Sequence, residues 1–73
     1  MEFKAVILTE IGDYLLESTK NYKWTDKGLE IQEAYIVNEE GLAQRIKAEK
    51  LTVTHNAIQG VQEGSFEEET VEK

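Results

Sequence analysis

The fold of this 73-residue chain depends on how one central stretch is interpreted, Asn38-Glu39-Glu40-Gly41 and the residues from Leu42 to Lys50. In one interpretation Asn38 caps a helix whose first turn is acidic and whose last turns are basic, as the helix dipole favours. In the other, residues 38–41 form a four-residue hairpin loop and the chain returns as a strand from Leu42. Because residues 42–50 consist mainly of strong helix formers, we prefer the helix.

The segments on either side of this stretch have the patterns of strands. Residues 29–37 alternate between two faces, and Glu33 interrupts the more apolar face. Residues 51–54 alternate in the same way and predict a further strand. Residues 3–9 are apolar on both faces in their middle, which is typical of a central strand. Residues 57–61 form either a short strand or an ordered loop.

A helix is expected between the first two strands. From Glu10 to about Tyr22 the apolar residues Ile11, Tyr14 and Leu15 recur at helical spacing, and Thr9 is placed to act as N-cap. The sequence therefore predicts a small α+β domain with the order strand-helix-strand-helix-strand. The alternative is a small, mostly antiparallel β-barrel with one helix.

The charge is acidic and unevenly distributed. Fifteen Asp and Glu residues against eight Lys and Arg give a net charge of −7, and residues 63–73 alone contribute −4. This composition predicts a globular domain over residues 1–62 and a disordered acidic tail over residues 63–73, in which Phe66 or Val71 could anchor a docked peptide. A negative field repels phosphate groups, so we expect neither a nucleic-acid partner nor a membrane partner.

The residues that usually carry chemistry are scarce. The chain has no Cys, and its single His55 has no carboxylate at helical or strand spacing, so no metal site is expected. Ser18 and Ser65 do not lie in a nucleophile motif, and the five glycines are scattered singly, so no phosphate-binding loop is present. We therefore expect no cofactor and no enzymatic activity.

The most distinctive local feature is aromatic. Tyr22 and the only tryptophan, Trp24, lie among three lysines in residues 20–27. Tyrosine and tryptophan are enriched at the energetic centres of protein interfaces, so this segment is a candidate contact site. In the alternative interpretation, Tyr22 ends the apolar stripe of the helix and Trp24 folds back to cover the small core.

Part of the chain resembles a known family. The stretch Ile7-Leu8-Thr9-Glu10-Ile11-Gly12-Asp13-Tyr14-Leu15-Leu16, followed by a strand over residues 29–37, is similar to the opening of phage tail-collar fibre proteins. Those proteins continue from this strand into a Gly-Asp-Gly turn, where this chain has Asn38-Glu39-Glu40-Gly41. The resemblance covers about half of the chain and implies a structural role in a virion.

Two functions follow from these features. The first is a non-enzymatic, cytoplasmic protein-binding module, an inhibitor or regulator of phage or mobile-element origin that acts on a basic surface of a partner protein. The second is a structural protein that forms a homo-oligomer, such as a virion tail component, through the apolar face of residues 29–37 or the strand edge at Leu51 and Val53. The residues expected to contact the partner in the first case are Tyr22, Trp24, Glu39, Glu40, Glu67, Glu68 and Glu69.

Overall fold

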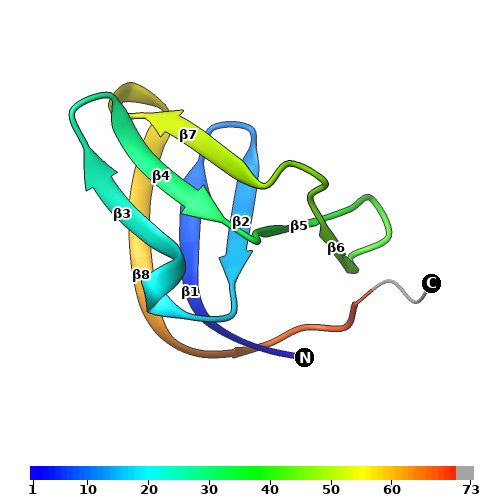
Figure 1. Cartoon of the computed structure of the whole chain (residues 1–73). Helices are drawn as coiled ribbons and strands as arrows, with labels where there is room; N and C mark the ends of the chain where they lie inside the picture. The colour runs from blue at the N-terminus through cyan, green and yellow to red at the C-terminus, as the bar shows by residue number, and fades with distance from the viewer. Residues whose placement is uncertain (71–73) are drawn as a thin grey trace.

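The computed structural model describes residues 1–70 and consists almost entirely of strands in two antiparallel sheets. The five-stranded sheet has the order β6-β5-β2-β1-β8, and the three-stranded sheet, with the order β3-β4-β7, packs across it (Figure 1). The predicted α+β fold is therefore wrong, since the only helical segments described are two three-residue turns. The elements are β1 (Glu2–Thr9), β2 (Gly12–Leu16), η1 (Thr19–Asn21), β3 (Tyr22–Thr25), β4 (Gly28–Gln32), β5 (Tyr35–Val37), β6 (Ala43–Arg45), β7 (Lys50–Thr54), η2 (His55–Ala57) and β8 (Ile58–Glu67).

The first predicted helix is replaced by the β1–β2 hairpin. Thr9, expected to cap a helix, instead donates from Oγ1 to the carbonyl oxygen of Gly12 and accepts from the backbone N–H of Ile11. A threonine uses the same hydroxyl to cap a helix and to stabilise a hairpin turn, which explains why a helix was predicted here. The three residues 14–16 are all buried, as expected for a strand that is covered on both faces.

The second predicted helix is replaced by a hairpin between β5 and β6, so the loop interpretation of residues 38–41 holds. The side-chain oxygen of Asn38 accepts hydrogen bonds from the backbone N–H groups of Glu40 and Leu42, at 2.9 and 3.0 Å. The N–H of Gly41 donates to the carbonyl oxygen of Asn38. An asparagine that bonds to the backbone ahead of it stabilises a turn as well as a helix start, and here the turn prevails.

The predicted single strand over residues 29–37 is two strands that belong to different sheets. Its apolar face is interrupted at Glu33, and there the backbone adopts a φ of 52°, which few residues other than glycine favour. The chain turns at this residue from β4 in the three-stranded sheet to β5 in the five-stranded sheet. The charged residue in the apolar pattern therefore marks the corner between the sheets.

Strand β8 runs across the boundary predicted at residue 62, so residues 63–67 of the expected tail belong to a strand. Strand β8 continues to Glu67 and pairs antiparallel with β1, with two irregularities in register. Beyond it, the carbonyl oxygen of Glu69 accepts from the N–H of Ala43 at 2.7 Å, and Thr70 forms a parallel bridge with Ala43. Phe66 is half-buried against the core. Residues 71–73, with the expected anchor Val71, lie outside the described residues.

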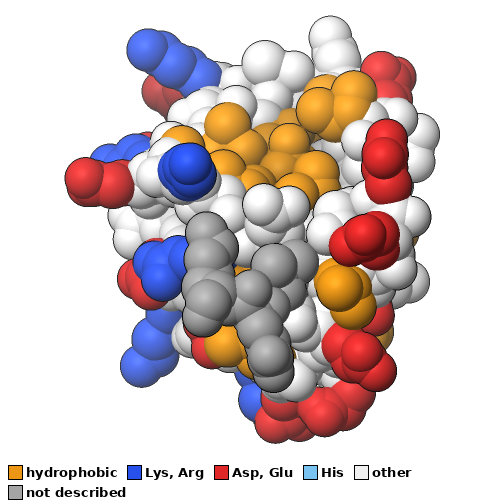
Figure 2. Space-filling view, turned by 90° about the vertical axis from the view of Figure 1, so that its right-hand side faces the viewer, with side chains coloured by type: hydrophobic (Ala, Val, Ile, Leu, Met, Phe, Trp, Pro, Cys, Tyr) orange, Lys and Arg blue, Asp and Glu red, His pale blue; other side chains and the backbone are white. Residues whose placement is uncertain are grey.

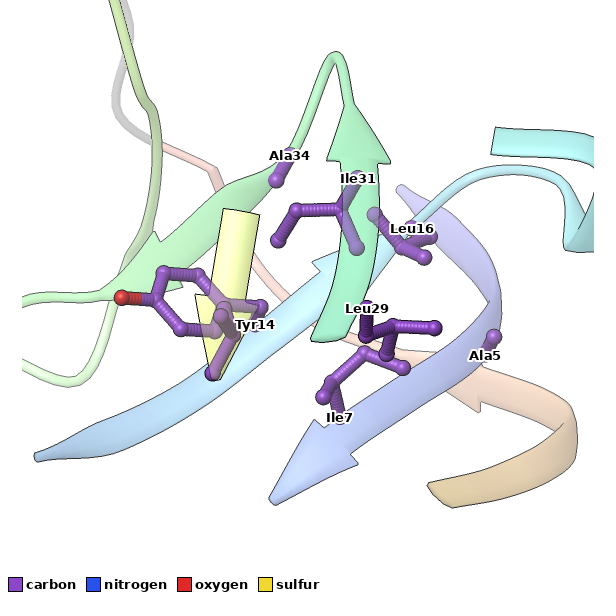
Figure 3. Packing of buried hydrophobic residues seen from close by; sticks show 8 residues of the cluster. Ala5, Ile7, Tyr14, Leu16, Leu29, Ile31 and Ala34 are labelled. Atoms are coloured by element: carbon purple, nitrogen blue, oxygen red, sulfur yellow. The ribbon is translucent and has the colours of Figure 1, made fainter. Parts of the chain in front are cut away.

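The main hydrophobic core lies between the two sheets. Figure 3 shows Leu29 and Ile31 of β4 facing Ile7 of β1 and Leu16 of β2. These four side chains are almost fully buried, and truncating one of them to alanine would cost about 2–5 kcal/mol. A second cluster, formed by Phe3, Val6, Leu15 and Ala43, packs with Leu8, Tyr35 and Phe66. Burial on both faces explains why β1 is the most apolar segment of the chain.

Two hairpin turns share one four-residue pattern, Thr9-Glu10-Ile11-Gly12 and Thr25-Asp26-Lys27-Gly28. In each, the threonine Oγ1 donates to the glycine carbonyl oxygen and accepts from the N–H of the third residue. Both glycines have a φ of 148°, a conformation that residues with a side chain rarely adopt. Strand pairing places the two turns at the same end of the molecule, beside η2.

Candidate protein-interaction surface

Tyr22, on β3, packs against the core and contacts the other sheet. Its side chain is half-buried against the core between the sheets, and its hydroxyl donates a hydrogen bond to the carboxylate of Glu63 on β8. This hydrogen bond, followed by burial and by the charge of Glu63, raises the pKa of Tyr22 above its ordinary value. The contact joins an edge strand of each sheet, so Tyr22 helps to close that side of the molecule.

Trp24, on the same strand, is exposed. Its side chain is 56% accessible to solvent and does not cover the core, contrary to the alternative interpretation of this segment. The indole ring instead lies beside the imidazole of His55 in η2, with ring centroids 5.8 Å apart and an angle of 57° between the planes. A large aromatic group is therefore held in place on the surface by a second ring.

Ile11 lies at the same end of the molecule, although the sequence predicted it on the apolar face of a helix and not at a contact site. It is 80% exposed, at the tip of the β1–β2 turn. The N–H of the adjacent Glu10 donates to the carbonyl oxygen of Ala57 at 3.3 Å, which joins this turn to η2. The signal that could have revealed Ile11 is the match between its turn and residues 25–28, where Lys27 takes the equivalent solvent-facing place.

Residues 10–11, 24–27 and 55–57 together form the turn end of the molecule. Figure 1 shows the β1–β2 turn, the β3–β4 turn and the segment between β7 and β8 together at the top of the molecule. The exposed charged residues of this end are Glu10, Asp26 and Lys27, with Asp13 close by on β2. The turn end thus combines two exposed apolar side chains with a predominantly acidic surround, and small apolar centres with a polar rim are typical of protein interfaces.

The predicted acidic contacts lie elsewhere. Glu39 and Glu40 are exposed in the β5–β6 turn, and Glu67, Glu68 and Glu69 lie where β8 ends. The hydrogen bond from Ala43 to Glu69 brings these two sequence-distant groups beside the same strand, β6. Figure 1 shows this part of the chain at the opposite end from the β3–β4 turn, so the seven predicted contact residues do not form one surface.

The basic residues are also segregated. On β3, β4 and β7, the ammonium groups of Lys23 and Lys50 lie 4.0 and 3.9 Å from the carboxylate of Glu30. In Figure 2, acidic side chains gather along the right and lower edges of the face shown, while most Lys and Arg side chains lie on the left. Although the net charge is −7, this face has a more acidic side and a more basic side.

A groove of about 920 Å³ adjoins the basic side. It lies between the β4–β5 corner, β6 and the start of β7, and it is lined by Tyr35, Arg45, Lys47 and Lys50 among others. The guanidinium of Arg45 lies 3.7 Å from the carboxylate of Glu33. The described lining contains no serine, cysteine or histidine, and its ionisable side chains are those of Glu, Tyr, Lys and Arg residues.

Residues 1–70 contain neither a cluster of potential metal ligands nor a long apolar helix. No group of three or more His, Cys, Asp or Glu side chains in this part of the chain is placed to hold a metal ion. The same residues form no helix with the length and apolar character needed to cross a membrane.

No protein-family model, curated protein or solved structure matches this chain. The likeness of residues 7–16 and 29–37 to tail-collar fibre proteins thus has no support beyond those residues. What the protein does must be inferred from its surface.

Proposed function

We propose that this protein is a non-enzymatic binding module, an inhibitor or regulator that docks through its turn end on an apolar, basic-rimmed site of a partner protein in the cytoplasm. The observation that carries the proposal is the exposure of Trp24. A tryptophan that is more than half exposed and held against His55 presents a large apolar surface that is already ordered. Burial of such a side chain contributes strongly to binding, and little conformational entropy is lost when it docks.

Ile11 and the nearby charges support the same surface. Ile11 extends the apolar area on the other side of η2, and its burial would add to the hydrophobic gain. Glu10 and Asp26 flank the two apolar side chains and outnumber Lys27. A partner with lysines or arginines around an apolar depression would complement this arrangement.

The glutamates of residues 39–40 and 67–69 contribute to binding in a different way from the turn end. Glu39, Glu40, Glu67 and Glu69 are exposed and remote from Trp24, so they act on the partner through the long-range field without direct contact. We expect their removal to slow association and to leave dissociation nearly unchanged. Substitutions at the turn end should have the opposite effect, because buried contacts mainly control dissociation.

Affinity capture with matched variants tests the proposal. Immobilised wild-type protein is compared with Trp24→Thr, Ile11→Lys and Val37→Lys, the last replacing another exposed apolar residue, 39% accessible, on β5. Ile11→Lys and Val37→Lys make the same change of charge, so a difference between them reports position alone. The proposal requires a protein that is retained by the wild type and by Val37→Lys and lost with the two turn-end variants.

The purified partner then gives a second readout. Because Trp24 is the only tryptophan, binding should shift its fluorescence emission to shorter wavelength, and added salt should slow association. Equal retention by all four proteins would contradict the proposal. An association rate that does not change with salt would remove its electrostatic part.

A further inference from the structure

The edges of the two sheets are protected to different degrees. The outer side of β6 is occupied by residues 69–70, and β8 carries two register irregularities together with Glu63 and Glu67. Strand β3 is only four residues long and contains Lys23 and the bulky Trp24. Short length, bulges and charged residues are the usual means by which a strand edge avoids pairing with another chain.

Strand β7 has fewer of these protections, since it is one residue longer than β3, has no bulge, and carries its one charged residue, Lys50, at its first position. It pairs with β4 over five residues without a break in register, and no described strand pairs with its other edge. Residues 51–54, Leu-Thr-Val-Thr, are uncharged, and three of the four are β-branched. Within residues 1–70, β7 is therefore the edge best suited to accept a further strand.

The difference in size between the sheets leaves room for such a strand. The three-stranded sheet ends at β7, whereas the facing sheet continues through β5 and β6. Ile36 of β5 and Ile46 are only half-buried against the core, and Figure 2 shows hydrophobic side chains gathered on this side of the molecule. A fourth strand beside β7 would lie over part of this apolar area.

We propose that β7 pairs antiparallel with β7 of a second copy of this chain. A twofold axis at Thr52 places Leu51 opposite Val53 of the second copy and Lys50 opposite Thr54 of the second copy. No like charges face each other, and the apolar residues continue one inner face across the junction. By contrast, pairing between two β8 strands would bring acidic edges together. The dimer is independent of the function proposed for the turn end.

The substitution Thr52→Lys should weaken the dimer without unfolding the monomer. Thr52 is exposed and pairs with Glu30 of β4, so a lysine at this position would lie in solvent beside a carboxylate that Lys23 and Lys50 also approach. At the twofold axis it would instead face the lysine of the second copy, which is unfavourable. Gln62→Lys is the control, since it makes the same change of charge at an exposed position of β8.

Solution mass, measured by light scattering or sedimentation equilibrium, tests whether the chain dimerises through β7. We expect the wild type and Gln62→Lys to pass from 8.3 kDa to twice that mass as concentration rises, and Thr52→Lys to dimerise about tenfold more weakly with unchanged circular dichroism. Added salt should tighten the dimer, because both copies are negatively charged. A wild-type monomer at all concentrations, or a dimer that Thr52→Lys does not weaken, would overturn the proposal.

Discussion

The turns Thr9–Gly12 and Thr25–Gly28 are locally alike and differ in their surroundings. Each has the same threonine hydrogen bonds and the same glycine φ of 148°. Gly28, however, is buried beside β7, with which it pairs at Thr54, whereas Gly12 is half-buried and a side chain there would meet only Ile36. The comparison shows that four residues suffice to specify a turn, while the neighbouring strands determine how costly a change in it would be.

The largest difference in stability is expected between alanine substitutions at the two glycines. In Gly28→Ala the new methyl group would overlap the carbonyl oxygen of Val53, so β7 would have to move, in addition to the strain at this φ. In Gly12→Ala the methyl group would lie 3.4 Å from Cδ1 of Ile36, a flexible atom that can give way. We expect a loss of about 4 kcal/mol or more at Gly28 and about 1–3 kcal/mol at Gly12.

Urea denaturation monitored by circular dichroism measures both values. Equal losses would mean that the backbone conformation alone, and not the approach of β7, sets the requirement for glycine. In that case the two turns would be equivalent in the folded protein as well as in their sequence pattern.

Valine substitutions at the two threonines should differ less in their effect on stability. A change to valine keeps the shape of the side chain and removes the hydroxyl, which leaves an N–H donor and a carbonyl acceptor without this partner. Thr9 is only 6% exposed, whereas Thr25 is half-buried, so water can replace the lost bonds more easily at Thr25. We expect Thr9→Val to cost about 1–2 kcal/mol and Thr25→Val about 0.5–1 kcal/mol. A larger loss at Thr25 in the same denaturation experiment would contradict this order.

The exchange of the turn tips should have the least effect on stability. In the double variant Ile11→Lys with Lys27→Ile, each residue takes the place of its counterpart at an exposed position, and the net charge is preserved. The free energy of unfolding should change by less than about 0.5 kcal/mol. Any partner that docks on the turn end should nevertheless bind more weakly, because the apolar group has moved. Unchanged affinity in a fluorescence titration of Trp24 would show that Ile11 makes no contact.

The sequence predicts strands more successfully than it predicts their connections. The central strand near the N-terminus and the strand over residues 51–54 are confirmed, because β-branched residues and burial on both faces leave little alternative. Thr9 and Asn38 misled the prediction, since a side-chain oxygen that bonds to the N–H two residues ahead serves equally in a helix cap and in a hairpin turn. The recurrence of Thr-acid-x-Gly at residues 9–12 and 25–28 was the available signal for the first hairpin.

The candidate surface could be predicted only in part. Trp24 stands out by its residue type, but its exposure depends on the position of β3 at a sheet edge and on His55, which is distant in sequence. Ile11 has no distinguishing feature until its turn is recognised. Tyr22, next but one to Trp24, has a structural contact with Glu63 because the strand carries it toward the sheet junction. Strand order, which pairs segments far apart in the chain, supplied what local patterns lack.

The pairing of β1 with β8 also has a consequence for the way the chain folds. Ile7 pairs with Val61 and Glu2 with Glu67, so one edge of the central strand finds its partner only after almost the whole chain is present. The two hairpin turns close loops of a few residues and form early, whereas this closure is entropically costly and comes late. Until β8 docks, the apolar residues from Ala5 to Leu8 expose an unpaired edge. We therefore expect folding on the millisecond-to-second timescale and a refolding yield that falls with protein concentration, because the waiting strand is open to other chains.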